Sequence, residues 1–67
     1  MTLREILFNV LTVNLIVWIW DQTGHCIYAG PRLEAVRTYG DCKVTGWRID
    51  GVQFRANILT ETRNRDG

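Results

Sequence analysis

The chain has 67 residues, of which 46% are hydrophobic and 22% are charged, and its formal net charge is +1. This composition is that of a globular domain and excludes an intrinsically disordered chain. A domain of this size has little interior besides its core, whereas substrate pockets commonly take roughly 300 to 1,000 Å³. The balanced charge predicts neither nucleic-acid binding nor attachment to an anionic membrane. We therefore expect one small domain without a catalytic site.

The two cysteines, Cys26 and Cys42, are too few for a disulfide-stabilised fold, and the residues before them do not predict a secretory signal. Reduced thiols and a cytoplasmic location are therefore expected.

The apolar run Ile6–Trp20 is the candidate membrane segment, but polar residues interrupt it, and it is shorter than the roughly 20 residues that a spanning helix needs. Its second half alternates and is β-branched, which favours a strand, so no membrane segment is predicted.

The start of the chain predicts a short helix. Thr2 and Glu5 have the spacing of a capping box, in which each side chain accepts a hydrogen bond from the backbone amide of the other. Apolar residues at helical spacing follow (Leu3, Ile6 and Leu7), so the helix is expected over residues 3–8.

Residues 11–20 alternate with a period of two, which predicts a central strand. One face is wholly apolar, and the other becomes apolar towards its end. Turn residues at 21–24 lead into a returning strand over residues 25–29. The expected cross-strand pairs are Trp20 with His25, Trp18 with Ile27 and Val17 with Tyr28, with Cys26 in the core opposite Ile19.

A second helix is expected over residues 32–37, because Pro31 supplies a favoured start and Gly40 a stop. Leu33 and Val36 would dock this helix on the sheet.

The dipeptide Asp50-Gly51 lies between two alternating runs and predicts a second hairpin with a two-residue loop. One side of this hairpin would be apolar and the other polar. The expected pairs are Ile49 with Val52, Trp47 with Phe54 and Thr45 with Ala56 on the apolar side, and Arg48 with Gln53 and Gly46 with Arg55 on the polar side.

The predicted order is therefore α-β-β-α-β-β. It is an α+β fold with a four-stranded, mainly antiparallel sheet of two hairpins and two short helices on one face. Residues 1–60 would form this single domain, and residues 61–67 a polar, frayed tail.

Five segments carry a resemblance over nearly the whole chain. They are residues 1–7 (Met-Thr-Leu-Arg-Glu-Ile-Leu), the strand end Trp20-Asp21, residues 27–30 (Ile-Tyr-Ala-Gly), residues 41–44 (Asp-Cys-Lys-Val) and the Asp50-Gly51 hairpin. In these segments the chain resembles small proteins encoded by prophages and other mobile elements. Some proteins of that size and origin inhibit host defence, anti-CRISPR proteins among them. The resemblance implies a function by contact and supplies no catalytic residues.

His25, Cys26, Asp41 and Cys42 are the residues that could suggest a metal or nucleophile site. Their spacing lacks the C-x2-C pattern of structural zinc, and neighbouring residues of a strand point to opposite faces. The sequence places no activating positive group beside either thiol on the same face of a strand, and it contains no catalytic triad or phosphate-binding loop. We therefore predict no enzyme, no metal and no cofactor.

A basic sheet face with aromatic rings is typical of modules that bind single-stranded nucleic acid. Arg48 and Arg55, with Lys43 nearby, share the polar side of the second hairpin, but Trp47 and Phe54 lie on its opposite side. The simpler interpretation is that the arginines keep the sheet soluble, so nucleic acid is the less favoured partner.

The stretch Thr12–Trp20 carries more apolar surface than two short helices can cover, because both of its faces become apolar. Either the tryptophans are in the core and Val17 and Ile19 are left outside, or the reverse. An uncovered aromatic patch is typical of a contact surface, although Arg and Tyr side chains could instead cover it. Trp and Tyr are also enriched among the residues that dominate binding interfaces.

These observations predict a non-catalytic, protein-binding protein, and the resemblance implies one of inhibitory type. The expected partner-binding residues are Trp18, Trp20 and Tyr28 as apolar anchors and Arg48 and Arg55 as charged contacts. The alternatives are a module that binds single-stranded nucleic acid or acts in regulation, with Arg48, Arg55 and Lys43 as contacts, and a self-associating subunit such as a homodimer.

Overall fold

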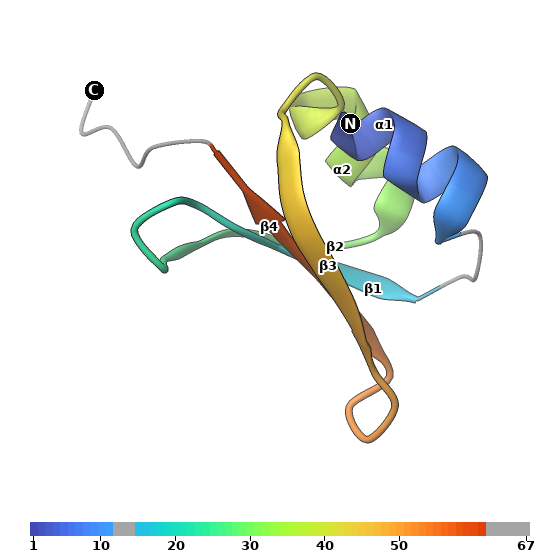
Figure 1. Ribbon diagram of the computed structural model, residues 1–67. Helices are drawn as coiled ribbons and strands as arrows, with labels where there is room; N and C mark the ends of the chain where they lie inside the picture. The colour runs from blue at the N-terminus through green and yellow to red at the C-terminus, as the bar shows by residue number, and fades with distance from the viewer. Residues whose placement is uncertain (12–14, 62–67) are drawn as a thin grey trace.

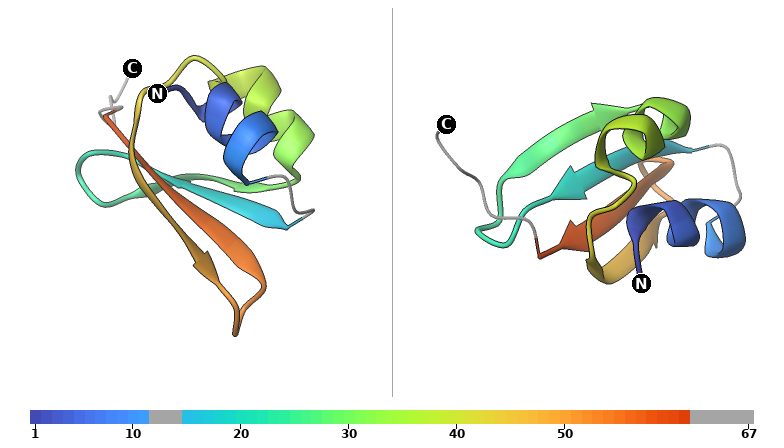
Figure 2. Two further views of the ribbon diagram at one scale, coloured as in Figure 1. Left: turned by 45° about the vertical axis from the view of Figure 1, so that its right-hand side comes forward. Right: turned by 90° about the horizontal axis from the view of Figure 1, so that it is seen from above.

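The computed structural model describes residues 1–11 and 15–61. Four strands form one sheet, and the helices lie together on one of its faces (Figures 1 and 2). The elements in chain order are α1 (Leu3–Glu5), the π-helical segment η1 (Ile6–Val10), β1 (Ile16–Trp20), β2 (Cys26–Gly30), α2 (Arg32–Tyr39), β3 (Val44–Asp50) and β4 (Arg55–Thr60). The predicted α+β class and the four-stranded sheet are confirmed. Thr12–Asn14 and residues 62–67, including most of the expected frayed tail, lie outside the described residues.

The sheet is mixed, with the strand order β2-β1-β4-β3. The pairs β1–β2 and β3–β4 are antiparallel, as predicted, but β1 and β4 pair in parallel at the centre. A central parallel pair is favoured here because both strands present fully buried side chains to the helices, Val17 and Ile19 from β1 and Ala56 and Ile58 from β4. The crossover from β1 to β4 runs through β2, α2 and β3.

The N-terminal helix begins at the predicted capping box. The backbone amide of Thr2 donates to Glu5 Oε1 at 2.9 Å, and that of Glu5 donates to Thr2 Oγ1 at 3.3 Å. The helix then widens into η1 and ends two residues later than predicted, at Val10. Its buried side chains are Leu3, Ile6 and Leu7, the apolar positions seen in the sequence.

The start of the chain is also joined to the sheet. Thr2 forms an antiparallel bridge with Lys43, in which Val44 N donates to Met1 O at 2.7 Å and Leu3 N donates to Cys42 O at 2.9 Å. Because β3 is an edge strand, this bridge covers the first part of an otherwise free edge.

Helix α2 is two residues longer than predicted and ends at Gly40, whose amide donates to Val36 O at 2.9 Å. Ala35 and Val36 are buried against the sheet, whereas Leu33 is 67% exposed. The expected docking role of Leu33 is therefore wrong, because the buried face of the longer helix runs through Ala35 and Val36 and excludes it.

The first hairpin is closed by a side chain, which changes the expected register. Asp21 Oδ1 accepts hydrogen bonds from the amides of Thr23 and His25, each at 2.9 Å, and Asp21 N donates to His25 O at 2.8 Å. Pairing therefore starts between Asp21 and His25, one residue after Trp20, and Gly24 in the loop takes a φ of 90°.

As a result, Trp20 lies opposite Cys26, with a bulge between Ile19 and Trp20. The predicted pairs of Trp20 with His25, Trp18 with Ile27 and Val17 with Tyr28 are wrong, and Cys26 is exposed, not in the core. The observed pairs further along are Ile19 with Tyr28, Trp18 with Ala29 and Val17 with Gly30.

The second hairpin has a four-residue loop, 51–54, in place of the predicted two-residue loop. Asp50 Oδ1 accepts hydrogen bonds from Val52 N at 3.0 Å and Gln53 N at 3.1 Å, and Phe54 closes the loop with a φ of 53°. The expected pairs are therefore wrong. Those observed are Asp50 with Arg55, Ile49 with Ala56, Arg48 with Asn57, Trp47 with Ile58 and Gly46 with Leu59.

Ten residues form the core between the helices and the sheet, and Tyr28, Tyr39, Ile27 and Val44 pack against it. The buried residues are Leu3, Ile6, Leu7, Leu11, Val17, Ile19, Ala35, Val36, Ala56 and Ile58. Across residues 1–11 and 15–61, no helix is both long enough and apolar enough to span a bilayer.

Candidate functional site

The helices leave one side of the sheet uncovered, and we call this side the open face (Figure 2). Its side chains are those that alternate with the core residues along each strand. The strand register arranges most of them in three rows across β1, β4 and β3. The rows are Ile16, Arg55 and Asp50; Trp18, Asn57 and Arg48; and Trp20, Leu59 and Gly46. Ala29 and Cys26 of β2 extend the second and third rows.

Two tryptophans and an arginine stack on this face. The rings of Trp18 and Trp20 are 6.1 Å apart between centroids and inclined by 24°, and the guanidinium of Arg55 lies 4.1 Å from the centroid of the Trp18 ring. This is the geometry of a cation–π contact. Trp18 is therefore in contact with a neighbouring ring and with a cation, and both tryptophans are half-buried within the sheet surface.

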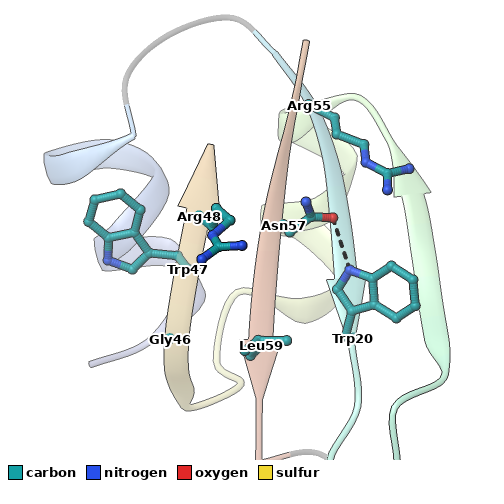
Figure 3. A pocket seen from close by; sticks show the side chains of 7 residues that line it. All are labelled: Trp20, Gly46, Trp47, Arg48, Arg55, Asn57 and Leu59. Atoms are coloured by element: carbon teal, nitrogen blue, oxygen red, sulfur yellow. Dashed lines mark hydrogen bonds between the residues drawn. The ribbon is translucent and has the colours of Figure 1, made fainter. Parts of the chain in front are cut away.

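A hydrogen bond fixes the orientation of the second tryptophan. Trp20 Nε1 donates to Asn57 Oδ1 at 3.1 Å across the parallel β1–β4 pair (Figure 3). Because the indole has only a donor, the amide of Asn57 presents its oxygen to Trp20. The amino group of Asn57 makes no hydrogen bond with the side chain of another described residue and is available as a donor.

The charges of the open face do not balance. Arg55 Nε lies 4.0 Å from Asp50 Oδ2, at the limit of an ion pair, and this Nε is buried without a hydrogen bond among the described residues. Arg48 is exposed, and its guanidinium has no ion-pair partner in residues 1–11 or 15–61. The three rows therefore carry two cations and one carboxylate.

A hollow of about 490 Å³ lies on the open face beside Trp20. It is bordered by Trp20, Gly46, Trp47, Arg48, Arg55, Asn57 and Leu59 (Figure 3). Gly46 stands where the third row would otherwise carry a side chain, so its missing Cβ helps to open this hollow. The ring of Trp47 is directed to the other side of β3, in agreement with its pairing to the buried Ile58.

The structure brings four of the five expected site residues to one face: Trp18, Trp20, Arg48 and Arg55. Tyr28 lies on the helix side, opposite Ile19. Its ring packs on Tyr39 with centroids 5.8 Å apart, and its hydroxyl donates to Pro31 O at 2.7 Å. Burial raises the pKa of Tyr28, and the nearby Glu34 and Tyr39 raise it further.

Sequence reasoning missed Gly46, Asn57 and Leu59. These residues join the site through the parallel pairing of β1 with β4, which places Asn57 beside Trp18 and Leu59 beside Trp20. The polar side of the second hairpin was identified in the sequence, but nothing in its periodicity indicated that the tryptophans of the first hairpin would continue the same surface.

Three of the four residues considered for metal binding or nucleophilic chemistry have other side-chain contacts. Asp41 forms an ion pair with Arg4 at 2.6 Å, Cys26 Sγ donates to Tyr28 O at 3.2 Å, and His25 Nδ1 is 2.9 Å from Thr23 Oγ1. Cys42, like Cys26, is a free thiol. Within the described ranges, no group of three His, Cys, Asp or Glu side chains could hold a metal ion.

Comparison of the chain with known proteins gives no significant match to a family model, a curated protein or a solved structure.

Proposed function

We propose that this protein acts by binding a protein partner through the open face of its sheet, without a catalytic step. The observation that carries the proposal is the convergence of Trp18, Trp20, Arg48 and Arg55 on a face that neither helix covers. Trp and Arg are the residues most enriched among those that dominate interface energetics. Ile16 and Leu59 are 46% and 50% exposed on the same face, so removing them from water would add apolar area to the contact.

A protein partner fits this surface better than a row of nucleobases does. Modules that bind single strands offer free ring faces on which the bases stack. Here the ring of Trp18 is in contact with the Arg55 guanidinium, and Trp20 is held against Trp18 and Asn57. The surface is a packed layer of rings and cations that suits contact with side chains.

Single-stranded nucleic acid is nevertheless a second candidate, because the aromatic rings and both arginines lie on one face. The sequence had weighed against this candidate, because the aromatic residues of the second hairpin, Trp47 and Phe54, were expected on the side opposite the arginines. Affinity for an oligothymidylate that falls steeply with salt concentration would favour this candidate, because phosphate contacts release counterions.

The resemblance to small mobile-element proteins extends the proposal to an inhibitor of host defence that acts in the cytoplasm. The two free thiols, Cys26 and Cys42, are compatible with a reducing compartment. Defence or phage genes beside the coding sequence would support this extension, and a place in a housekeeping operon would contradict it.

Site-specific photo-crosslinking tests the binding proposal. A photoreactive phenylalanine analogue at Leu59, on the open face, should form a covalent adduct with a protein partner in the organism that encodes the chain. The same analogue at Leu33, which is 67% exposed on α2, should not. Adducts at position 33 alone, or at neither position, would contradict the proposal. An adduct of the chain with itself would instead indicate the self-associating alternative, which sedimentation of the pure protein can verify.

A further inference from the structure

The hollow on the open face has a mixed lining. Trp20 and Leu59 provide apolar walls, and Arg48 and Asn57, which lie opposite each other on β3 and β4, provide donors (Figure 3). A side chain entering beside Gly46 would meet both kinds of group. Since this inference rests on the proposed function, it concerns the chemistry of the partner at that surface.

The polar groups at the hollow are all donors. The oxygen of the Asn57 amide already accepts a hydrogen bond from Trp20 Nε1, so its amino group is the part of this side chain that remains as a donor. Arg48 has five N–H groups and no acceptor, and no described carboxylate pairs with it. A ligand group that accepts hydrogen bonds and carries negative charge would therefore complement this pair.

The carboxylate already on this face does not fill that role. Asp50 accepts hydrogen bonds from the amides of Val52 and Gln53 and lies 4.0 Å from Arg55. It is thereby held at the end of β3, in the row of Arg55 and not in that of Arg48. The positive charge at Arg48 remains uncompensated within the described residues.

The apolar walls restrict the ligand further. The half-exposed Leu59 and the indole of Trp20 border the same hollow, so the acidic group should be attached to an apolar neighbour that covers them. We propose that the hollow receives an aspartate or glutamate side chain of the protein partner, with an adjacent apolar residue packed on Trp20 and Leu59.

Selection from a display library of random peptides on the immobilised protein tests this proposal. The retained peptides should be enriched in Asp or Glu next to an apolar residue. A selected peptide should bind about ten-fold more weakly when its acidic residue is replaced by the amide, as expected for loss of a charge-assisted hydrogen bond. Peptides that keep their affinity after this replacement would overturn the proposal.

Three variants locate the interaction. Arg48→Gln should weaken the acidic peptide about ten-fold but leave its amide counterpart unchanged, so that the two changes are not additive. Gly46→Leu should abolish binding, because the new side chain fills the hollow. The fold should tolerate this substitution, since a Cβ at position 46 meets only Leu59 Cδ1, at an ordinary 3.7 Å, and the backbone need not move. Arg37→Gln is the matched control, since Arg37 is exposed on α2 and pairs with Glu34 at 3.3 Å.

The outcomes separate this inference from the proposed function. If the selected peptides lack a carboxylate but no longer bind the Gly46→Leu variant, the acidic nature of the ligand is overturned and the open face is kept as the binding surface. Failure to retain any peptide, or retention unaffected by Gly46→Leu and Arg48→Gln, would overturn both. Displacement of the peptide by an oligothymidylate at low salt would favour the nucleic-acid candidate over the acidic protein segment. Near-UV circular dichroism of the tryptophans verifies that each variant is folded.

Discussion

Arg55 of β4 lies with its guanidinium 4.1 Å from the centre of the Trp18 ring of β1, across the parallel pair at the centre of the sheet. This contact joins the two hairpins on the open face, and the core joins them on the other. A single arginine therefore contributes both to the stability of the sheet and to the shape of its exposed surface. Arg48 lies on the same face without such a contact, which makes the two arginines a natural pair for comparison.

We expect Arg55→Gln to lower the free energy of unfolding by about 1 kcal/mol, because it removes a partly buried cation–π contact and the packing of the arginine stem. Arg48→Gln should change it by less than about 0.5 kcal/mol, as for most exposed positions. Urea denaturation followed by far-UV circular dichroism measures both. Equal losses for the two variants would mean that the contact with Trp18 has no role in stability.

The neighbours Ile58 and Leu59 test the assignment of the two faces of β4. Ile58 is fully buried against the helices, so Ile58→Ala should cost about 2 to 5 kcal/mol and unfold much of the protein. Leu59 is 50% exposed on the open face, and Leu59→Ala should cost less than about 1 kcal/mol. Thermal denaturation distinguishes the two, and the reverse order would show that the sheet faces are assigned wrongly.

Phe54 is the described non-glycine residue with a positive φ, 53°, a conformation that side chains with a Cβ disfavour. It is also 71% exposed, so little packing is lost when its ring is removed. We expect Phe54→Gly to be more stable than Val52→Gly by about 1 kcal/mol, because Val52 is an exposed loop residue without a positive φ. Chemical denaturation of both variants provides the comparison, and equal stabilities would mean that the loop holds no backbone strain.

Asp21 should make the stability depend on pH in the acid range. Its burial in the first loop raises its pKa, but the hydrogen bonds from Thr23 and His25 outweigh this effect and leave the pKa below the ordinary value of 3.8. A carboxylate with a lowered pKa in the folded state stabilises the fold above its unfolded-state pKa, and this contribution is lost as the pH falls through the folded-state pKa.

Asp21→Asn should therefore destabilise the protein near neutral pH and reduce the loss of stability below a pH of about 4. Glu5, whose pKa is lowered mainly by the backbone and side-chain hydrogen bonds of Thr2, contributes to the acid transition in the same direction. The variant Glu5→Gln measures the contribution of this second carboxylate to the pH dependence, so that the contribution of Asp21 can be told apart from it. Urea titrations at several pH values measure the effect, and an unchanged pH profile for Asp21→Asn would contradict this role for Asp21.

The sequence predicts which side chains share a face better than it predicts which residues are paired. Alternation along β3 and β4 places Arg48 and Arg55 together and Trp47 on the other side, and the observed register preserves this because it differs from the expected one by an even number of residues. The register itself depends on two aspartates, Asp21 and Asp50, that accept amide hydrogen bonds inside their loops. A dipeptide pattern does not reveal this, because the same Asp-Gly pair fits loops of several lengths.

The candidate site is less accessible to sequence reasoning than the fold. Trp18 and Trp20 were expected at a contact surface, but their neighbours Asn57 and Leu59 come from β4, at the other end of the chain. Pairing between distant strands depends on the packing of the whole core and leaves no local pattern. Tyr28 was expected among the apolar anchors, but it lies opposite Ile19 on the side of the helices, and its expected pairing with Val17 would have placed it on that same side.

The parallel pairing of Val17 with Ala56 also has a consequence for how the molecule acquires its structure. Each hairpin alone is a two-stranded unit with marginal stability in water, and neither has a complete hydrophobic layer until β1 pairs with β4. During synthesis the first hairpin and α2 must wait for β4 before the middle of the sheet exists. We expect folding to be a single late event dominated by distant contacts, and therefore slower than that of a helical bundle of equal length.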